Sequence, residues 1–202
     1  MFTRAGDEFV PAAAVQTHTA TLPAVERSTA RTVGFLDCSR TADLTSLVLL
    51  GARDGENLAE LDTFRIEVWD PKRSPMGRVR YSEIRDALES LLPCFPRLLE
   101  LRVDVTASSD AQDLVDHLRR LPGGRRVEPW HADRRGNREL WDALERRLLG
   151  DASALRIPDH ARLQKELRAL RIKPQGSGFA VVDPTNSHAR LSTRSRGRAA
   201  GR

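Results

Sequence analysis

The order of strand-like and helix-like segments is the feature that most restricts how this chain can fold. Residues 32–38 are almost continuously apolar, as in a strand that is buried on both faces. Two more strand patterns, at 44–50 and 63–69, follow after short polar turns. Three strands joined by such short connections predict an antiparallel meander.

The pattern then changes to alternating helices and strands. A helical period over 81–92 leads to a strand at 98–105, and a helix over 109–121 leads to a short strand at 126–130. Because a strand that is reached through a helix usually lies parallel to its neighbour, we expect the fourth strand beside the first. We therefore predict an α/β fold, a mixed sheet in the order 3-2-1-4-5 flanked by helices.

The chain divides by composition into three parts. Residues 1–31 show no sustained period, which indicates a linker or an N-terminal arm. Residues 32–186 hold all the periodic segments, including a last strand at 178–182. Residues 187–202 indicate a basic, disordered tail, because five arginines and no acid follow His188. That tail could bind nucleic acid, or it could be out-of-frame coding sequence.

The charge balance favours a polyanionic partner. The formal net charge is +5 at pH 7, and neutralising phosphates releases counterions. Apolar runs such as that at 47–50 are too short to span a bilayer, and the first residues lack the apolar core of a signal peptide. Cys38 and Cys94 fit neither a metal-binding spacing nor a disulfide framework. We therefore expect a cytoplasmic protein with no membrane contact.

Asp37 and Asp104 end the first and fourth predicted strands. If these strands are parallel neighbours, their carboxyl ends meet at one edge of the sheet, where open α/β sheets bind ligands. Two carboxylates repel each other there unless a cation lies between them, and oxygen ligands favour Mg²⁺ or Mn²⁺. A pair of such ions about 4 Å apart can activate water and stabilise the leaving oxygen of a phosphodiester. Alternatively, each Asp is only a turn or cap residue after its strand.

Several segments resemble the nuclease part of viral terminase large subunits. Residues 35–47 are similar to the first strand of that nuclease, where an Asp on the strand is followed by a small polar turn, a second Asp and another apolar strand. Residues 101–104, Leu-Arg-Val-Asp, resemble its second acidic strand end. Two later segments also fit the pattern of that nuclease: one runs from residue 127 through a predicted helix that contains Trp141, and the other is 157–167. The resemblance therefore covers roughly residues 30–188.

The resemblance implies a ribonuclease-H-like nuclease domain of phage or prophage origin. Asp37 and Asp104 would bind two catalytic ions, Mg²⁺ or Mn²⁺, and Asp43 would be an auxiliary acid or a turn residue. The implied reaction is the cleavage of concatemeric viral DNA during packaging. The implied partners are double-stranded DNA and a separate terminase ATPase, small subunit or portal. The sequence has no Gly-rich phosphate loop followed by Lys and Ser/Thr, so the resemblance is to the nuclease half alone.

The place of the third acid departs from the family pattern and leaves other interpretations open. The family's third acid usually follows a short polar stretch, often His-Asp-Asp, but residues 187–190 are Ser-His-Ala-Arg here. Asp183 is the nearest acid and is therefore the candidate for the third catalytic position. A decayed prophage fragment would keep the fold, and DNA binding, without cleavage. A resolvase-like or transposase-like enzyme would use an acid on a late helix, for which Glu166 is the candidate.

Arginines in loops and at helix starts are candidates for contacts with DNA phosphates. Arg134, Arg135 and Arg138 lie together at the start of one predicted helix and are the candidates for DNA binding. Arg119 and Arg126 belong to the same stretch of the chain. The alternative is that these side chains are only solvated.

Overall fold

The computed structural model describes most of the 202-residue chain. The described residues are 8–38, 44–106, 109–121, 124–131, 134–151, 154–175 and 178–182. Their strands are β1 (Thr19–Ala20), β2 (Thr32–Asp37), β3 (Thr45–Ala52), β4 (Leu61–Trp69), β5 (Leu98–Asp104), β6 (Val127–Trp130), β7 (Leu155–Pro158), β8 (Arg171–Gln175) and β9 (Gly178–Val182). Their α-helices are α1 (Ala12–His18), α2 (Tyr81–Leu91), α3 (Ser109–Leu118), α4 (Arg134–Leu149) and α5 (Ala161–Ala169). Short 3-10 helices are η1 (Pro71–Arg73), η2 (Leu92–Cys94) and η3 (Gly124–Arg126).

The main sheet has the strand order β1-β7-β4-β3-β2-β5-β6. Five consecutive strands of this sheet, β4-β3-β2-β5-β6, correspond to the predicted order 3-2-1-4-5, which is confirmed. β2 is antiparallel to β3 and parallel to β5, and β6 is parallel to β5. β7 and β1 extend the sheet beyond β4, and β8 and β9 form a separate hairpin. The sequence did not predict β1, β7 or β8.

The centre of the sheet is closely packed around β2. Its register with β5 ends with Leu36 opposite Val103. A Cβ atom at Gly34 would lie 2.6 Å from Cδ2 of Leu49 and 3.0 Å from Cδ1 of Leu101. Glycine therefore leaves the space over the middle of β2 that two large core side chains fill.

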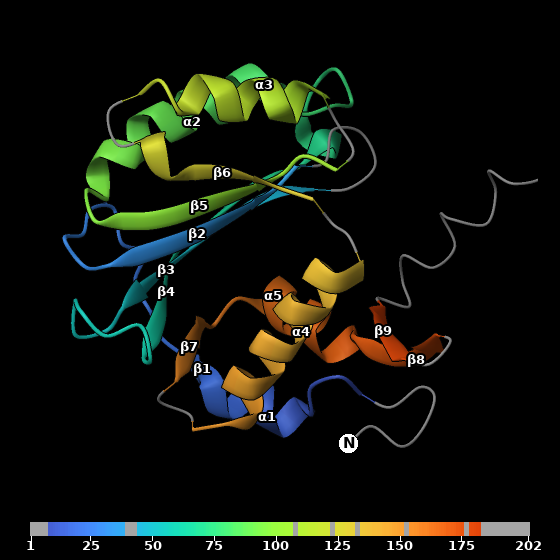
Figure 1. Ribbon diagram of the computed structural model, residues 1–202. Coiled ribbons are helices and arrows are strands. Elements are labelled where there is room, and N and C mark those ends of the chain that lie inside the picture. The colour runs from blue at the N-terminus through green and yellow to red at the C-terminus, as the bar shows by residue number, and fades with distance from the viewer. Residues whose placement is uncertain are drawn as a thin grey trace, which may run out of the picture.

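Two hydrophobic cores lie on opposite sides of the sheet. Figure 1 shows α2 and α3 over one face, and α1, α4 and α5 on the other side. The first core joins α2 and α3 to the central strands, with buried members that include Leu36, Leu47, Ile84, Leu88, Leu101 and Leu118. The second core lies among α1, α4, α5 and β7, with buried members that include Phe9, Val15, Leu148, Ile157 and Leu167. The three-residue and four-residue spacings of α2 and α3 place their apolar side chains on one helical face, as predicted.

The N-terminal segment packs against the domain, although its sequence indicated a linker or an arm. β1 pairs in parallel with β7, and Phe9, Val10 and Val15 are buried. The ring of Phe9 contacts that of Trp141 on α4 edge to face, with centroids 5.4 Å apart. The helix escaped prediction because its single buried valine stands among alanines and polar residues, so no apolar period is visible. The predicted tail, 187–202, lies outside the described residues.

Two helices begin at residues that are not the commonest N-cap types. Arg80 occupies the N-cap position of α2, and it makes no capping hydrogen bond through its side chain. His160 caps α5, and its Nδ1 accepts a hydrogen bond from the backbone N–H of Leu163 at 3.2 Å. None of the helices within the described ranges is long and apolar enough to cross a membrane.

Candidate metal-binding edge of the sheet

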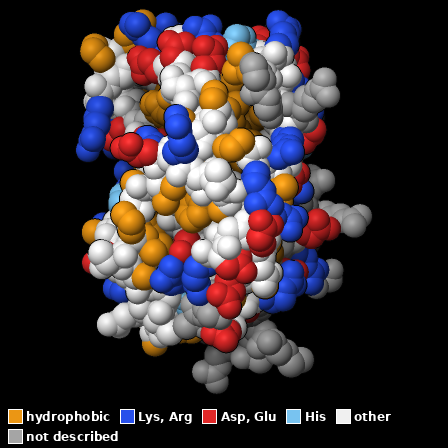
Figure 2. All heavy atoms as spheres, turned by 90° about the vertical axis from the view of Figure 1, so that its left-hand side faces the viewer, with side chains coloured by type: hydrophobic (Ala, Val, Ile, Leu, Met, Phe, Trp, Pro, Cys, Tyr) orange, Lys and Arg blue, Asp and Glu red, His pale blue; other side chains and the backbone are white. Residues whose placement is uncertain are grey.

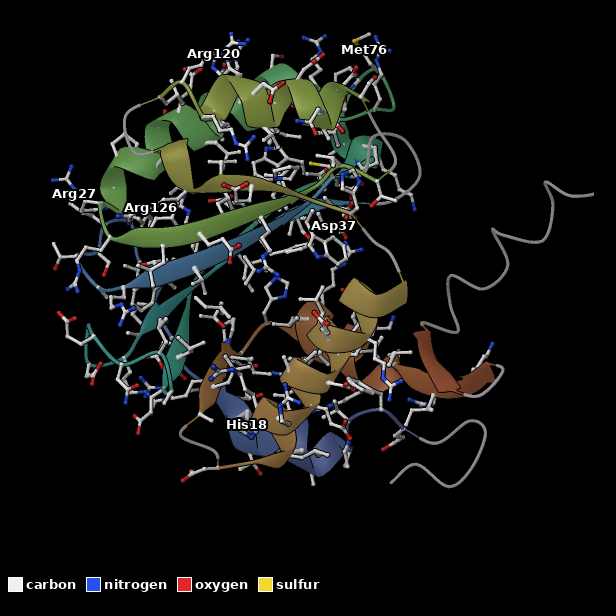
Figure 3. All side chains as sticks on the ribbon, viewed as in Figure 1. His18, Arg27, Asp37, Met76, Arg120 and Arg126 are labelled. Atoms are coloured by element: carbon white, nitrogen blue, oxygen red, sulfur yellow. The ribbon has the colours of Figure 1, made fainter. Side chains whose placement is uncertain are left out.

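Asp37 and Asp104 lie side by side at the carboxyl ends of β2 and β5. The parallel pairing of these strands ends one residue earlier, so the two carboxylates occupy the next level of the ladder. Because side chains alternate along a strand, both point away from the face that α2 and α3 cover. Figure 3 shows Asp37 at this end of the sheet, near the point where α4 begins. The topology thus brings together two acids that are far apart in the sequence.

An aromatic pair packs on the same face, next to the two acids. Trp130, at the end of β6, is opposite Asp104 in the ladder. Its ring contacts that of Phe35 edge to face, with centroids 5.3 Å apart. Phe35 precedes Asp37 by two residues on β2 and therefore faces the same way. This contact holds the two rings together on the face of the sheet that carries the carboxylates.

Asp104 also has a turn role. Its Oδ1 accepts a hydrogen bond from the backbone N–H of Thr106 at 2.8 Å. That bond supports the turn after β5, as the alternative interpretation of this residue expected. It does not exclude a ligand role, because a carboxylate has two oxygens with several acceptor positions.

The negative charge at this edge contributes to the pKa of the Cys38 thiol. Burial, and after it the negative charges of Asp37 and Asp104, raise the pKa of Cys38 to about 12, against a hydrogen bond with Tyr81 that lowers it. Both carboxylates therefore act on one thiol, which agrees with their adjacent places in the ladder. The Cys38 side chain belongs to the core on the α2 and α3 side of the sheet, so it does not stand beside the two carboxylates as a soft ligand. The chemistry available here is that of hard carboxylate oxygens.

The other predicted acids do not join this pair within the described residues. Asp43 and Asp183 lie outside them. Glu166 is on α5, exposed, with Arg162 Nε donating to its Oε1 at 2.7 Å. Across the part of the chain that the structure describes, no group of three or more His, Cys, Asp or Glu side chains could hold a metal ion. Two carboxylates are thus the ligands available from the described part of this edge.

The predicted DNA-binding arginines are at the start of α4. α4 begins shortly after β6, whose last residue is opposite Asp104, so this helix starts at the acidic edge. The Arg138 side chain is exposed, and its Nε lies 3.8 Å from Oδ2 of Asp142. The side chains of Arg134 and Arg135 lie outside the described part of the structure.

Two other arginines have structural partners. Nε of Arg119 donates to the backbone oxygen of Val127 at 2.7 Å, and its guanidinium also pairs with Glu128. Arg126 donates to the backbone oxygen of Leu98. These contacts attach α3 and η3 to the strands of the sheet, so neither side chain is simply solvated.

A basic loop at the same end of the sheet was not predicted from the sequence. It connects β4 to α2 and contains Lys72, Arg73, Arg78 and Arg80. Its four basic residues within nine positions were the available signal.

The strand order, the directions of the strands and the helices on both faces define a ribonuclease-H-like mixed α/β fold. No protein-family model matches the sequence, and no curated protein is significantly similar to it in sequence. The class of fold therefore comes from the three-dimensional arrangement.

Solved structures of phage terminases share this fold. The large terminase of bacteriophage HK97 superimposes with a TM-score of 0.63 and 16% sequence identity, over 87% of this chain and 39% of that protein. The large terminase nuclease of thermophilic phage G20c, solved with bound magnesium, gives a TM-score of 0.60 and 15% identity, over 88% of each chain. The predicted resemblance to terminase nuclease domains is thus confirmed at the level of the fold. This chain spans well under half of the HK97 protein.

Proposed function

We propose that this chain is a metal-dependent DNA endonuclease of the terminase type, which cuts viral DNA concatemers during packaging in the host cytoplasm. One observation carries the proposal: Asp37 and Asp104 end adjacent parallel strands of a fold shared with the G20c nuclease, whose structure holds magnesium. Adjacent carboxylates at such an edge suit a hard divalent cation.

Asp37 and Asp104 would hold Mg²⁺ or Mn²⁺ in a two-metal site. When bound, such ions supply an activated water and a charge that stabilises the leaving oxygen of a phosphodiester. The chain's own residues position the ligands: the Thr106 N–H orients the Asp104 carboxylate, and the Phe35–Trp130 contact supports the strands beside it. Asp183 is proposed as the third ligand and Asp43 as an auxiliary acid.

The proposed substrate is double-stranded DNA, which Arg134, Arg135 and Arg138 would contact at the start of α4. These residues lie beside the acidic edge in the chain's topology, and the exposed Arg138 supports the proposal. Because this chain spans only part of a whole terminase, an ATPase, a small subunit or a portal would be its partners in packaging.

The test is nicking of supercoiled plasmid in Mn²⁺. We expect the natural chain to nick, and Asp37→Asn and Asp104→Asn each to lose at least about a hundredfold in rate, since even small misplacement of reacting groups costs that much. Asp113→Asn is the matched control, because this exposed acid of α3 lies outside the acidic edge and undergoes the same chemical change. Nicking that persists in both edge variants would contradict the proposed site.

The third acid requires a separate comparison. Asp183→Asn should abolish nicking if Asp183 is the third ligand, while Asp43→Asn should reduce it less. A natural chain that binds DNA without nicking, but nicks after Ala189→Asp and Arg190→Asp, would instead identify a fragment that has lost its third ligand.

A further inference from the structure

A basic loop, residues 70–80, leaves the sheet at the edge that carries Asp37. Its start is fixed by the antiparallel ladders: Trp69 is opposite Thr45, and Asp37 is opposite Ser46. Since neighbouring strands lie about 4.8 Å apart, the loop begins roughly 10 Å from the acidic edge. Figure 3 shows Met76, near the middle of the loop, at the same end of the sheet as Asp37 and on the side of α2 and α3.

The basic loop is folded and anchored at both ends. Pro71 and Val79 are buried, so the loop is attached to the domain on each side of its tip. Oδ1 of Asp70 accepts a hydrogen bond at 2.9 Å from the backbone N–H two residues later. Gly77 has a φ of +62°, which glycine adopts without strain, and its N–H donates to the Ser74 oxygen at 2.9 Å. The backbone that carries the charged side chains is therefore held in a defined conformation.

The four basic side chains of the loop point outward. Lys72, Arg73, Arg78 and Arg80 are all exposed, and the Arg73 side chain is 90% exposed. The ion pairs of Arg73 with Asp70 and of Arg80 with Glu83 are long, with 4.0 Å between nitrogen and oxygen in each. Lys72 and Arg78 have no ion-pair partner among the described residues. Such cations can contact phosphates without giving up a strong ion pair.

Arginines at the opposite end of the sheet are arranged differently. Arg97 pairs with Glu56 at 2.5 Å, and Arg53 and Arg156 both pair with Asp62. On the face shown in Figure 2, acidic and basic side chains accordingly lie interspersed. The basic loop thus combines a local excess of unneutralised positive charge with a place at the same end of the sheet as Asp37, on the side of α2 and α3 (Figure 3).

We infer that the basic loop binds the phosphate backbone of duplex DNA on the α2 side of the cleavage site. This inference rests on the proposed function and adds a second DNA contact to the one proposed at α4. The loop would hold phosphates at a distance from the scissile bond, because it extends away from the acids on the side of α2 and α3 (Figure 3). Phosphate contacts of this kind fix the orientation of the duplex without reading its sequence.

The test compares two triple variants with the same loss of charge. The first is Lys72→Ala, Arg73→Ala and Arg78→Ala in the loop. The control is Arg27→Ala, Arg120→Ala and Lys165→Ala, which removes exposed basic residues elsewhere; Figure 3 shows Arg27 and Arg120 away from Asp37. Binding of a labelled duplex is measured by fluorescence anisotropy over a salt series, in EDTA and in an Asp37→Asn background to prevent cleavage. Thermal melting checks that both triples are folded.

We expect the loop variant to bind more weakly and with a smaller slope of log K against log salt. Each lost phosphate contact should reduce that slope by about 0.9, so three contacts should reduce it by roughly 2 to 3. The control should keep the parent slope. Equal slopes in all three proteins, equal losses in both triples, or no DNA binding by the parent would overturn the inference.

The nicking assay separates this inference from the proposed function. If the natural chain nicks plasmid but the loop variant binds and nicks as well as the control, the loop inference fails and the endonuclease stands. If the natural chain binds DNA through the loop but never nicks, the endonuclease proposal fails and the loop inference stands.

Discussion

Removing one acid from the sheet edge should have opposite effects with and without metal. In EDTA, Asp37→Asn relieves the repulsion between two adjacent carboxylates, so the variant should be more stable than the natural chain. In Mn²⁺ the natural chain should be the more stable, because an ion that binds only the native state stabilises it. The two melting curves should therefore change order when metal is added.

The expected sizes follow from the geometry. Neighbouring strands lie about 4.8 Å apart, and charges at about that separation repel by roughly 1 kcal/mol in water and roughly 3–4 kcal/mol at an effective dielectric of 20. Asp37 is exposed, so the lower figure applies. For a domain of 150–250 residues, about 1 kcal/mol shifts the melting temperature by roughly 2–4 °C. At an ion concentration about a hundred times the Kd, binding contributes about 2.7 kcal/mol, or roughly 5–10 °C.

The assay is thermal melting of the natural chain, Asp37→Asn and Asp104→Asn in EDTA and in a Mn²⁺ series. Asp104→Asn is informative because an asparagine oxygen can still accept the Thr106 hydrogen bond, so the turn survives while the charge is lost. If both variants melt below the natural chain in EDTA and all three respond equally to Mn²⁺, the acids have only a structural role and the argument is refuted.

Three further predictions concern the body of the domain. Burial alone would raise the pKa of Asp62, but hydrogen bonds from Arg156 and Arg53 hold that pKa below its usual value. The ionised Asp62 therefore stabilises the folded chain above about pH 4, and this stabilisation is lost as the pH falls. Asp62→Asn should therefore cost about 1–2 kcal/mol at pH 7, discounted for the partly exposed arginines, and less at pH 3; an equal cost in urea melts at both pH values would contradict this. Gly34→Val should lower the melting temperature by roughly 5 °C or more, because its Cβ would meet Leu49 Cδ2 at 2.6 Å; an unchanged melting temperature would show that the strands move apart freely. At pH 8 the buried thiol of Cys38 should resist a thiol reagent in the folded protein and react in urea; rapid labelling of the folded protein at this position would contradict its raised pKa.

The sequence by itself determined the centre of the sheet. The continuous apolar pattern of β2, the alternation in β4 and the helical periods of α2 and α3 are local signals, because each depends on which face of one element is buried. The rule that a helical crossover joins parallel strands then placed β5 beside β2. That rule was enough to predict that Asp37 and Asp104 share an edge, and the order of the acidic motifs indicated the fold of a terminase nuclease.

Only the tertiary structure decided how the periphery is assembled. β1 has two residues and pairs with β7, and β7 has four residues and pairs with β1 and β4, so each depends on hydrogen-bond partners from distant parts of the chain. The burial of Phe9 and Val15 likewise depends on α4 and α5, far along the chain. A contact made by residues distant in sequence leaves no local period.

The same distinction applies to the arginines. In the sequence, Arg119 and Arg126 could not be told apart from Arg78, because each is a cation in a polar segment. The structure gives Arg119 and Arg126 backbone carbonyls as acceptors, whereas Arg78 stands exposed on a loop at the same end of the sheet as Asp37. Composition determined that the chain has an excess of arginine, but the packing decided which guanidinium groups stabilise the domain and which remain available to a phosphate. The physical reason is that a guanidinium donates hydrogen bonds to the acceptors that lie within its reach, and only the folded chain determines which acceptors those are.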